Sequence, residues 1–296
     1  MQFNNLVKGF IVAGALFAGA AQAAFVPLPA GPVTLEDDNL EYVLSPTGTN
    51  GAYEIKTSGD LAVGDRLRAM ISFQTVGGTS TQAPGLEVTG ISEIEIASVE
   101  FPSGPDFPLI TFKPSEAFEA EYGTGAMAAL YSQAAGDFPL TTELCSEMGV
   151  PGCEEVATNG ELWMVAGLSD ADDYWTSTSF GLDGISIDRV KAALASQPIG
   201  IATYALTILE NNTGYEFAQQ ELTGSFIKAT SPEDNLVDLI GSGTLLGGAG
   251  LDSPFFARSD FDFNLLRTVD VPEPATLAIF SLGLLGLGFR ARSSAK

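Results

Sequence analysis

Alternation of apolar and polar residues with a period of two is the feature that most constrains the fold of this chain. In DRLRAMISFQTV, residues 65–76, one strand face would carry Leu67, Ala69, Ile71 and Phe73. In SDFDFNLL, residues 259–266, Phe261, Phe263 and Leu265 alternate with polar residues in the same way. The stretches ISEIEIASVEF, ELWMVAGL, IATYALTIL and GYEFAQQELTGSFIKAT are further strand candidates. Many short alternating runs between glycine-rich turns predict a mainly β body. The expected fold is an antiparallel β-sandwich-like one, in which one face of each sheet is exposed to solvent.

Two stretches break this alternation and predict helices inserted among the strands. SEAFEAEYGTGAMAALYSQAAG follows Pro114, and Ser115 is placed to cap it, with Glu116 and Glu119 near its positive end. Gly123 and Gly125 are positions at which this helix would divide. SIDRVKAALASQ has Ser186 as its cap and an apolar stripe of Ile187, Val190 and Leu194.

The two cysteines, Cys145 and Cys153, stand in CSEMGVPGC. In an exported protein this spacing predicts one disulfide, which closes a loop turned by the Gly and Pro residues between them. The proline-rich FPSGPDFPLITFKP and this loop bracket a predicted insertion, residues 102–160, within one β-rich body, residues 24–270.

Composition removes several classes of function. The chain has no histidine, which excludes Ser-His-Asp and Cys-His catalysis and histidine-bearing zinc sites. Its 37 acidic residues against 13 basic ones give a net charge of −24, which argues against nucleic-acid binding. The sequence predicts no catalytic residue and no required cofactor, and the acidic charge leaves Ca²⁺ as the cation to consider.

Acidic loops are the calcium candidates. SDADDYW gathers Asp170, Asp172 and Asp173, and alternating carboxylates in a loop can bind calcium, a hard cation. The EF-hand spacing is absent, so a solvated acidic loop is the alternative interpretation. LEDDNLEY, residues 35–42, is a weaker candidate of the same kind.

Three other features of the sequence have simple structural explanations. The glycines of GSGTLLGGAG, residues 241–250, lack the third glycine and the Lys-Ser/Thr of a phosphate loop, and they favour a glycine-rich hairpin before the last strand. Trp163 and Trp175 are interpreted as core residues more readily than as sugar-stacking platforms. Ice binding would need a flat, repeated threonine array, whereas GTSTQ and WTSTSF are isolated.

The N-terminus has the form of an export signal. Lys8 precedes an apolar stretch that is too short to span a bilayer, and Ala21-Gln22-Ala23 has the small-x-small form of a signal-peptidase site. Residues 1–23 are therefore a predicted signal peptide, and the mature protein is expected to begin at Ala24.

The C-terminal tail, residues 271–296, has three parts. Val271-Pro272-Glu273-Pro274 comes first, and the apolar run 275–289 follows it. As a helix this run would be roughly 22 Å long, shorter than the roughly 30 Å of hydrocarbon in a bilayer. Arg290 and Arg292 come directly after it and are expected to stay on the cytoplasmic side. The tail is thus a predicted short transmembrane helix that holds the body on the outer side.

These three parts, in this order, resemble the PEP-CTERM protein-sorting signal of exopolysaccharide-producing Gram-negative bacteria. The same tail is also known as the ice-binding protein C-terminal domain. The resemblance covers about 26 of the 296 residues and says nothing of the body's fold. It implies that an exosortase, a membrane protease or transpeptidase, removes the tail, after which the protein is released or attached to the cell surface.

Together these features predict an exported protein of the cell envelope or exopolysaccharide and biofilm matrix, with a structural or binding role. Its partners would be signal peptidase, exosortase and extracellular polysaccharide, and its contact with the membrane would end at processing. Two alternatives stay open: a carboxylate-dependent polysaccharide hydrolase, and a calcium-dependent carbohydrate-binding module.

Overall fold

The computed structural model describes residues 26–48, 51–80, 86–102, 104, 107–133, 142–180, 185–222 and 236–268. Its helices are α1 (Glu116–Tyr122), α2 (Thr142–Ala157) and α3 (Ile187–Ala192). Its strands, in chain order, are β1 (Gly31–Pro46), β2 (Tyr53–Lys56), β3 (Arg66–Val76), β4 (Thr79–Ser80), β5 (Glu87–Glu100), β6 (Leu109–Pro114), β7 (Ala126–Gln133), β8 (Glu161–Gly167), β9 (Tyr174–Ser179), β10 (Pro198–Asn211), β11 (Gln220–Glu221), β12 (Leu236–Val237), β13 (Leu239–Leu246) and β14 (Ala257–Arg267).

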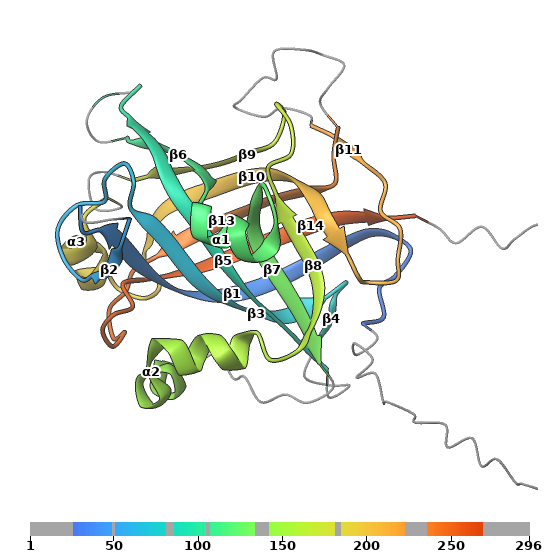
Figure 1. Ribbon diagram of the computed structural model, residues 1–296, viewed down its shortest axis with the longest axis horizontal. Coiled ribbons are helices and arrows are strands. Elements are labelled where there is room, and N and C mark those ends of the chain that lie inside the picture. Colours follow the sequence, from blue (N-terminus) through green and yellow to red (C-terminus); the bar gives the residue numbers. More distant parts are fainter. Residues whose placement is uncertain are drawn as a thin grey trace, which may run out of the picture.

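The long strands form one antiparallel sheet that closes on itself (Figure 1). Neighbouring strands follow the order β3, β1, β14, β13, β10, β8, β7 and β5, and β5 pairs in turn with β3. The predicted mainly β, antiparallel body is confirmed, and its sheet is a closed, barrel-like ring in place of the two stacked sheets of a sandwich. A ring of this size encloses an interior that side chains can fill.

Two long strands, β5 and β10, each have two partners along one side. The first half of β5 pairs with β7 and its second half with β6. The first half of β10 pairs with β9 and its second half with β8. Because β6 also pairs with β9, two short strand pairs bridge the space between β5 and β10. Residues 102–160, the predicted insertion, therefore supply β6 and β7 to the main sheet.

Side chains from the alternating strands point into the interior as the sequence predicts. Ala69, Ile71 and Phe73 of β3 are buried, and so are Phe261 and Phe263 of β14. The long prediction for GYEFAQQELTGSFIKAT is confirmed only at β11, since the residues before Gln220 do not belong to a named strand and residues 223–230 lie outside the described part.

Aromatic rings fill the middle of the interior. The ring of Tyr204 lies 4.8 Å from that of Trp175 and 5.2 Å from that of Phe263, between ring centroids. Phe263 in turn lies 5.5 Å from Phe73, in an edge-on arrangement that aromatic pairs favour. Trp163 and Trp175 are both buried, so their interpretation as core residues is confirmed.

Two glycines of β13 leave room for these rings. A Cβ atom on Gly241 would lie 2.0 Å from Cζ of Tyr204, and one on Gly243 would lie 1.6 Å from Cδ1 of Phe261. The stretch GSGTLLGGAG thus begins as a strand that pairs with β14, in agreement with the predicted glycine-rich hairpin. At these two positions the need for glycine comes from ring packing.

Replacing Gly243 with Ala should lower the free energy of unfolding by about 1–3 kcal/mol, because the new methyl group overlaps the buried ring of Phe261. Urea denaturation measures this change. The neighbouring Ser242 is exposed on the outer face, and Ser242→Ala should change stability by no more than about 0.5 kcal/mol. Equal stability of the two variants would contradict the packing role of Gly243.

The helix predictions are partly right. Ser115 caps α1, since its Oγ accepts a hydrogen bond of 3.2 Å from the backbone N–H of Phe118. The predicted helix is wrong beyond Gly123, because Ala126–Gln133 forms strand β7. In α3, Ile187 and Val190 are buried as predicted, whereas Leu194 is exposed because the helix ends at Ala192.

Helix α2 lies on the outside of the sheet, against β1 and β3 (Figure 1). It contains the predicted disulfide between Cys145 and Cys153, whose Cα atoms are 5.0 Å apart. A kink at Gly149, which has a φ of 72°, divides the helix between the two cysteines. Both cysteines are buried beside Tyr42 and Phe255, so the disulfide belongs to a small second core outside the ring.

Both predicted targeting segments lie outside the described residues. They are the signal peptide with its cleavage site at Ala21, Ala23 and Ala24, and the tail 271–296 with its apolar run 275–289. Within the part of the chain that the structure describes, no helix has the length and apolar character needed to cross a membrane.

Candidate functional site

A groove runs across the outer face of the ring, over β6, β9, β10, β13 and β14. It consists of two hollows of about 520 and 310 Å³, which share Ile201 and Thr203. The larger hollow is lined by Pro102, Phe107, Leu109, Thr176, Ser177, Thr178, Ile201 and Thr203. The smaller is lined by Ile201, Ala202, Thr203, Ser242, Gly243, Thr244, Asp260 and Asp262. We call these two hollows together the outer groove.

Strand register brings hydroxyl groups of this groove, and of the strands beside it, into a row. Thr176 of β9 lies opposite Thr203 of β10, which lies opposite Ser242 of β13. On the other side, Thr176 lies opposite Thr111 of β6, which lies opposite Ser98 of β5. Because directly opposed residues on one face are close neighbours, the five hydroxyl groups form a continuous polar strip.

Hydrogen bonds and apolar side chains complete the groove. The hydroxyl oxygens of Ser98 and Thr111 are 2.8 Å apart, and those of Thr176 and Thr203 are 3.2 Å apart. Phe107 and Ile201 line the groove and are 52% and 40% exposed. The groove therefore offers hydrogen-bonding groups beside an exposed aromatic ring, which is the combination that sugar rings require.

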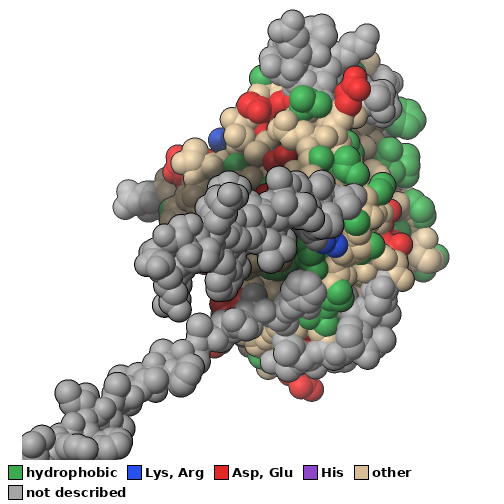
Figure 2. Space-filling model, turned by 90° about the vertical axis from the view of Figure 1, so that its right-hand side faces the viewer, with side chains coloured by type: hydrophobic (Ala, Val, Ile, Leu, Met, Phe, Trp, Pro, Cys, Tyr) green, Lys and Arg blue, Asp and Glu red, His purple; other side chains and the backbone are tan. Residues whose placement is uncertain are grey.

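The end of the groove over β14 is acidic. Asp260 and Asp262 line it, and Glu36 of β1 lies opposite Asp262. Partial burial raises the pKa of both Asp260 and Asp262, and the neighbouring carboxylates raise each pKa further. None of the residues that line the two hollows is Lys or Arg. Figure 2 shows one side of the molecule, where red acidic side chains are likewise more frequent than blue basic ones.

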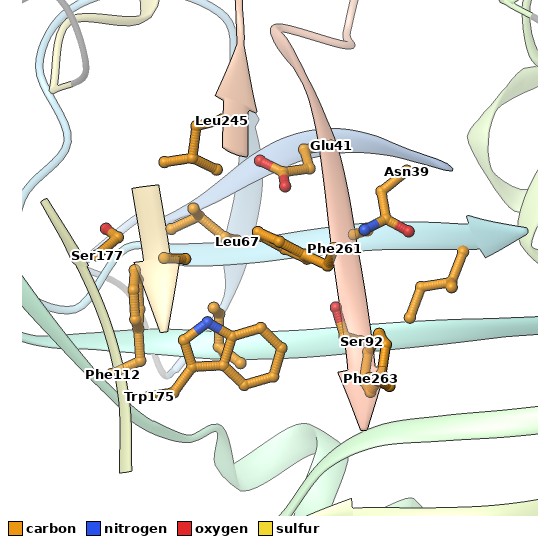
Figure 3. Close-up of a pocket in the computed structure, with 14 residues that line it drawn as sticks. Asn39, Glu41, Leu67, Ser92, Phe112, Trp175, Ser177, Leu245, Phe261 and Phe263 are labelled. Atoms are coloured by element: carbon orange, nitrogen blue, oxygen red, sulfur yellow. The ribbon is translucent and has the colours of Figure 1, made fainter. Parts of the chain in front are cut away.

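A second site lies inside the ring, in a cavity of about 40 Å³ (Figure 3). Its wall is mainly apolar and aromatic, with Trp175 and Phe261 among the lining residues. Asn39 and Glu41 of β1 and Ser92 of β5 contribute polar groups to this wall. The sequence does not predict strand β1, because LEDDNLEY has the composition of an acidic loop. Its residues 37, 39 and 41 instead point inward, in step with Leu35 and Val43.

Hydrogen bonds connect the polar residues of the interior. Ser259 Oγ donates to Glu41 Oε1 at 2.5 Å, and Asn39 Nδ2 donates to Ser259 Oγ at 3.1 Å. Asp37 Oδ1 accepts from the backbone N–H of Phe261 at 2.8 Å and from Asn39 Nδ2 at 3.4 Å. Burial raises the pKa of the Asp37 and Glu41 carboxyls, although these hydrogen bonds act in the opposite direction.

The predicted calcium residues occupy the loop between β8 and β9. Asp173 Oδ2 accepts hydrogen bonds from the backbone N–H of Ser169 at 2.6 Å and from Thr207 Oγ1 at 2.9 Å. Asp172 Oδ2 accepts from the backbone N–H of Leu236 at 2.8 Å. Asp172 and Asp173 are buried, so the solvated-loop interpretation is wrong for both, whereas Asp170 is exposed.

Asp172 and Asp173 have a structural role in this loop. Their hydrogen bonds fix the loop and tie it to β10 and β12. Among the described residues, no group of three His, Cys, Asp or Glu side chains is placed to hold a metal ion. Calcium binding by Asp170, Asp172 and Asp173 stays a prediction.

Comparison with known proteins identifies the C-terminal tail. The family model described as the PEP-CTERM protein-sorting motif matches residues 270–293. The chain carries a PEP-CTERM sorting signal. No curated protein and no solved structure matches the chain. The resemblance of Val271–Pro274, the apolar run and Arg290 and Arg292 to this signal is therefore confirmed, and the body remains without a recognised family.

The PEP-CTERM signal indicates how the protein is exported, sorted and processed. It implies that the protein is exported, is sorted to the cell surface and has an exosortase as its processing partner. The comparisons show no catalytic family for the body. The outer groove was missed from the sequence, because its residues come from strands that are far apart in the chain. WTSTSF, which is isolated in the sequence, supplies Thr176 and Thr178 to this groove.

Proposed function

We propose that this PEP-CTERM protein is a non-enzymatic component of the extracellular matrix, and that its outer groove binds exopolysaccharide. The observation that carries the proposal is the strip of hydroxyl groups across β5, β6, β9, β10 and β13, with the exposed ring of Phe107 beside it. Hydroxyl groups both donate and accept hydrogen bonds, as sugar hydroxyls do, and an aromatic face packs against the C–H groups of a sugar ring.

The arrangement of the groove suits an extended chain better than a small molecule. Its two hollows follow one another across neighbouring strands, which lie about 4.8 Å apart. The strip lies on the outer face of the ring, where Ser242 is exposed, Ser98, Thr111 and Thr203 are half-buried, and Thr176 is buried. An exported protein with such a surface can attach to matrix polysaccharide while its closed sheet remains rigid.

Removal of the Phe107 ring should weaken polysaccharide binding about tenfold, which corresponds to about 1.4 kcal/mol. The measurement is binding of the secreted, processed protein to exopolysaccharide purified from the producing culture. Thr203→Val removes a central hydroxyl group at nearly constant volume and should weaken binding in the same direction. Leu194→Ala changes a side chain that is 66% exposed and does not line the groove, so it should bind as the wild type does.

Two outcomes would contradict polysaccharide binding by the groove, and a third would contradict the non-enzymatic role. One is a wild-type protein that binds no polysaccharide from its own culture. The other is an affinity that Phe107→Ala and Thr203→Val leave unchanged, which would place binding elsewhere on the protein. Hydrolysis of the polysaccharide during the assay would contradict the non-enzymatic role while leaving the groove as the contact surface.

A further inference from the structure

The interior polar residues leave two acceptors without a partner. Asp37, Asn39, Glu41 and Ser259 are each at least 95% buried. The amide donor of Asn39 and the hydroxyl donor of Ser259 are used within this group. Asn39 Oδ1 and Asp37 Oδ2 are buried and have no hydrogen-bond partner among the described residues. Asn39 lines the interior cavity, whereas Asp37 does not. A ligand that lies in the cavity beside Asn39 Oδ1 must donate a hydrogen bond or carry positive charge.

Negative charge in this interior also lacks a cationic partner within the described chain. The residues that line the cavity include Glu41 but no Lys or Arg. The nearby basic residues of β3, Arg66 and Arg68, form ion pairs with Glu93 and Glu95 on the outer face. An isolated carboxylate in an apolar interior is costly, so it either takes up a proton or binds a cation.

The size and the chemistry of the cavity narrow the choice of ligand. A volume of about 40 Å³ admits a small ion with a few water molecules and excludes an organic ligand of ordinary size. Asn39 and Glu41 are two residues apart on the same face of β1, so their Cα atoms are about 6.8 Å apart, and both side chains line the cavity. A carboxylate, an amide oxygen and hydroxyl groups are oxygen ligands that suit hard cations.

We propose that this interior cavity binds a small monovalent cation, K⁺, Na⁺ or ammonium, at the carboxylate of Glu41, with Asn39 lining the same cavity. Asp37 adds a second negative charge along the same strand. A monovalent ion matches a site where one carboxylate lines the cavity, and the described residues hold no group of three metal-binding side chains for a divalent ion. Leu67 and Leu245 are only half-buried, and they mark the part of the wall through which an ion would enter. The inference does not depend on polysaccharide binding.

The test is the melting temperature of the processed protein in KCl, NaCl or ammonium chloride, compared with tetramethylammonium chloride at equal ionic strength. Preferential binding to the folded state should raise the melting temperature in at least one of the small cations by about 4 °C, whereas tetramethylammonium is too large to enter. Protons compete for the buried carboxyls, so the shift should be larger at pH 8 than at pH 5.

Matched variants locate the effect. Glu41→Gln should abolish the cation-dependent shift, and Glu36→Gln, which changes an exposed carboxylate on the outer face of the same strand, should keep it. If Glu41→Gln fails to fold, native mass spectrometry of the wild-type protein after exchange into each cation decides the question by counting bound ions. Equal melting temperatures in the small and large cations would overturn the proposal. A shift that survives Glu41→Gln, or stabilisation by acid alone without any cation effect, would also overturn it.

Discussion

Replacing Arg68 with Ala is expected to lower the free energy of unfolding by about 3–5 kcal/mol, because it leaves a buried carboxylate without its nearest cation. Arg68 Nη1 lies 2.7 Å from Glu93 Oε2, and the Glu93 side chain is only 1% exposed. The second cation at Glu93 is Arg66, whose Nη1 is 3.5 Å away. The loss of Arg68 therefore removes the shorter of the two ion pairs.

Arg68 also holds α2 against the sheet. Its Nε lies 2.8 Å from Glu154 Oε1 of α2, in an ion pair without the alignment of a hydrogen bond. The same carboxylate accepts a hydrogen bond from the hydroxyl of Tyr42. Because Tyr42 and the disulfide of α2 belong to one small core, we expect Arg68→Ala to loosen the packing of α2 as well as to destabilise the whole domain.

Urea denaturation measures the stability, and Lys113→Ala is the matched control. Lys113 Nζ forms an ion pair of 2.9 Å with Glu95 in the same network, but its side chain is 54% exposed. Because water screens an exposed pair, Lys113→Ala should cost no more than about 1 kcal/mol. A loss of less than about 1 kcal/mol for Arg68→Ala, too, would show that this buried network contributes little.

The two strands that carry this network show what the sequence can predict. Alternation in β3 and β5 assigns the outer faces to Arg66 and Arg68 and to Glu93 and Glu95, and the structure confirms both assignments. The register that places Arg68 opposite Glu93 and Arg66 opposite Glu95 is not visible in either stretch. Register depends on contacts between distant segments, so periodicity predicts faces but neither partners nor the closure of the sheet.

Two errors have a common physical origin. Ala126–Gln133 is rich in helix-forming residues, yet it forms β7, which is buried almost throughout between its neighbours. LEDDNLEY has the composition of a loop, yet it lies in β1, with Asp37, Asn39 and Glu41 turned inward. In both cases pairing within the sheet outweighs local propensity. The inward carboxylates of β1 broke the apolar alternation by which the other strands were found.

Functional residues can be predicted from the sequence when they lie in one continuous stretch, and not when folding brings them together from distant segments. The sorting signal occupies one continuous stretch, so its residues can be identified from the sequence alone. The hydroxyl strip joins Ser98, Thr111, Thr176, Thr203 and Ser242, which only the folded sheet brings together. No spacing rule connects these five positions in the chain.

Replacing Glu273 with Ala is expected to block removal of the tail almost completely. Glu273 is the charged residue between Pro272 and Pro274, near the start of the matched residues 270–293. The flanking prolines fix the backbone torsion φ and carry no N–H, which favours an extended segment that a protease cleft can accept. The substitution removes the charge that an exosortase can recognise and leaves the apolar run 275–289 unchanged, so uncut precursor should accumulate in the membrane fraction.

Before it is removed, the tail should act as a transient membrane anchor. Its apolar run would be some 8 Å shorter than the hydrocarbon thickness, so its grip on the membrane should be weak. Arg290 and Arg292 should keep its end on the cytoplasmic side. Replacing both with Ala should therefore weaken retention and release uncut protein, which is the opposite distribution from that of Glu273→Ala.

Fractionation of cells with an active exosortase separates these outcomes, with one epitope tag in the body and another after Lys296. The wild-type protein should lose the second tag, whereas Glu273→Ala should keep both tags in the membrane. Ser294→Ala, which lies in the tail but outside the matched residues 270–293, should be processed as the wild type is. Because the signal acts through one continuous stretch, its effect should not depend on the stability of the body. If the wild-type protein keeps both tags, the tail is an ordinary membrane anchor.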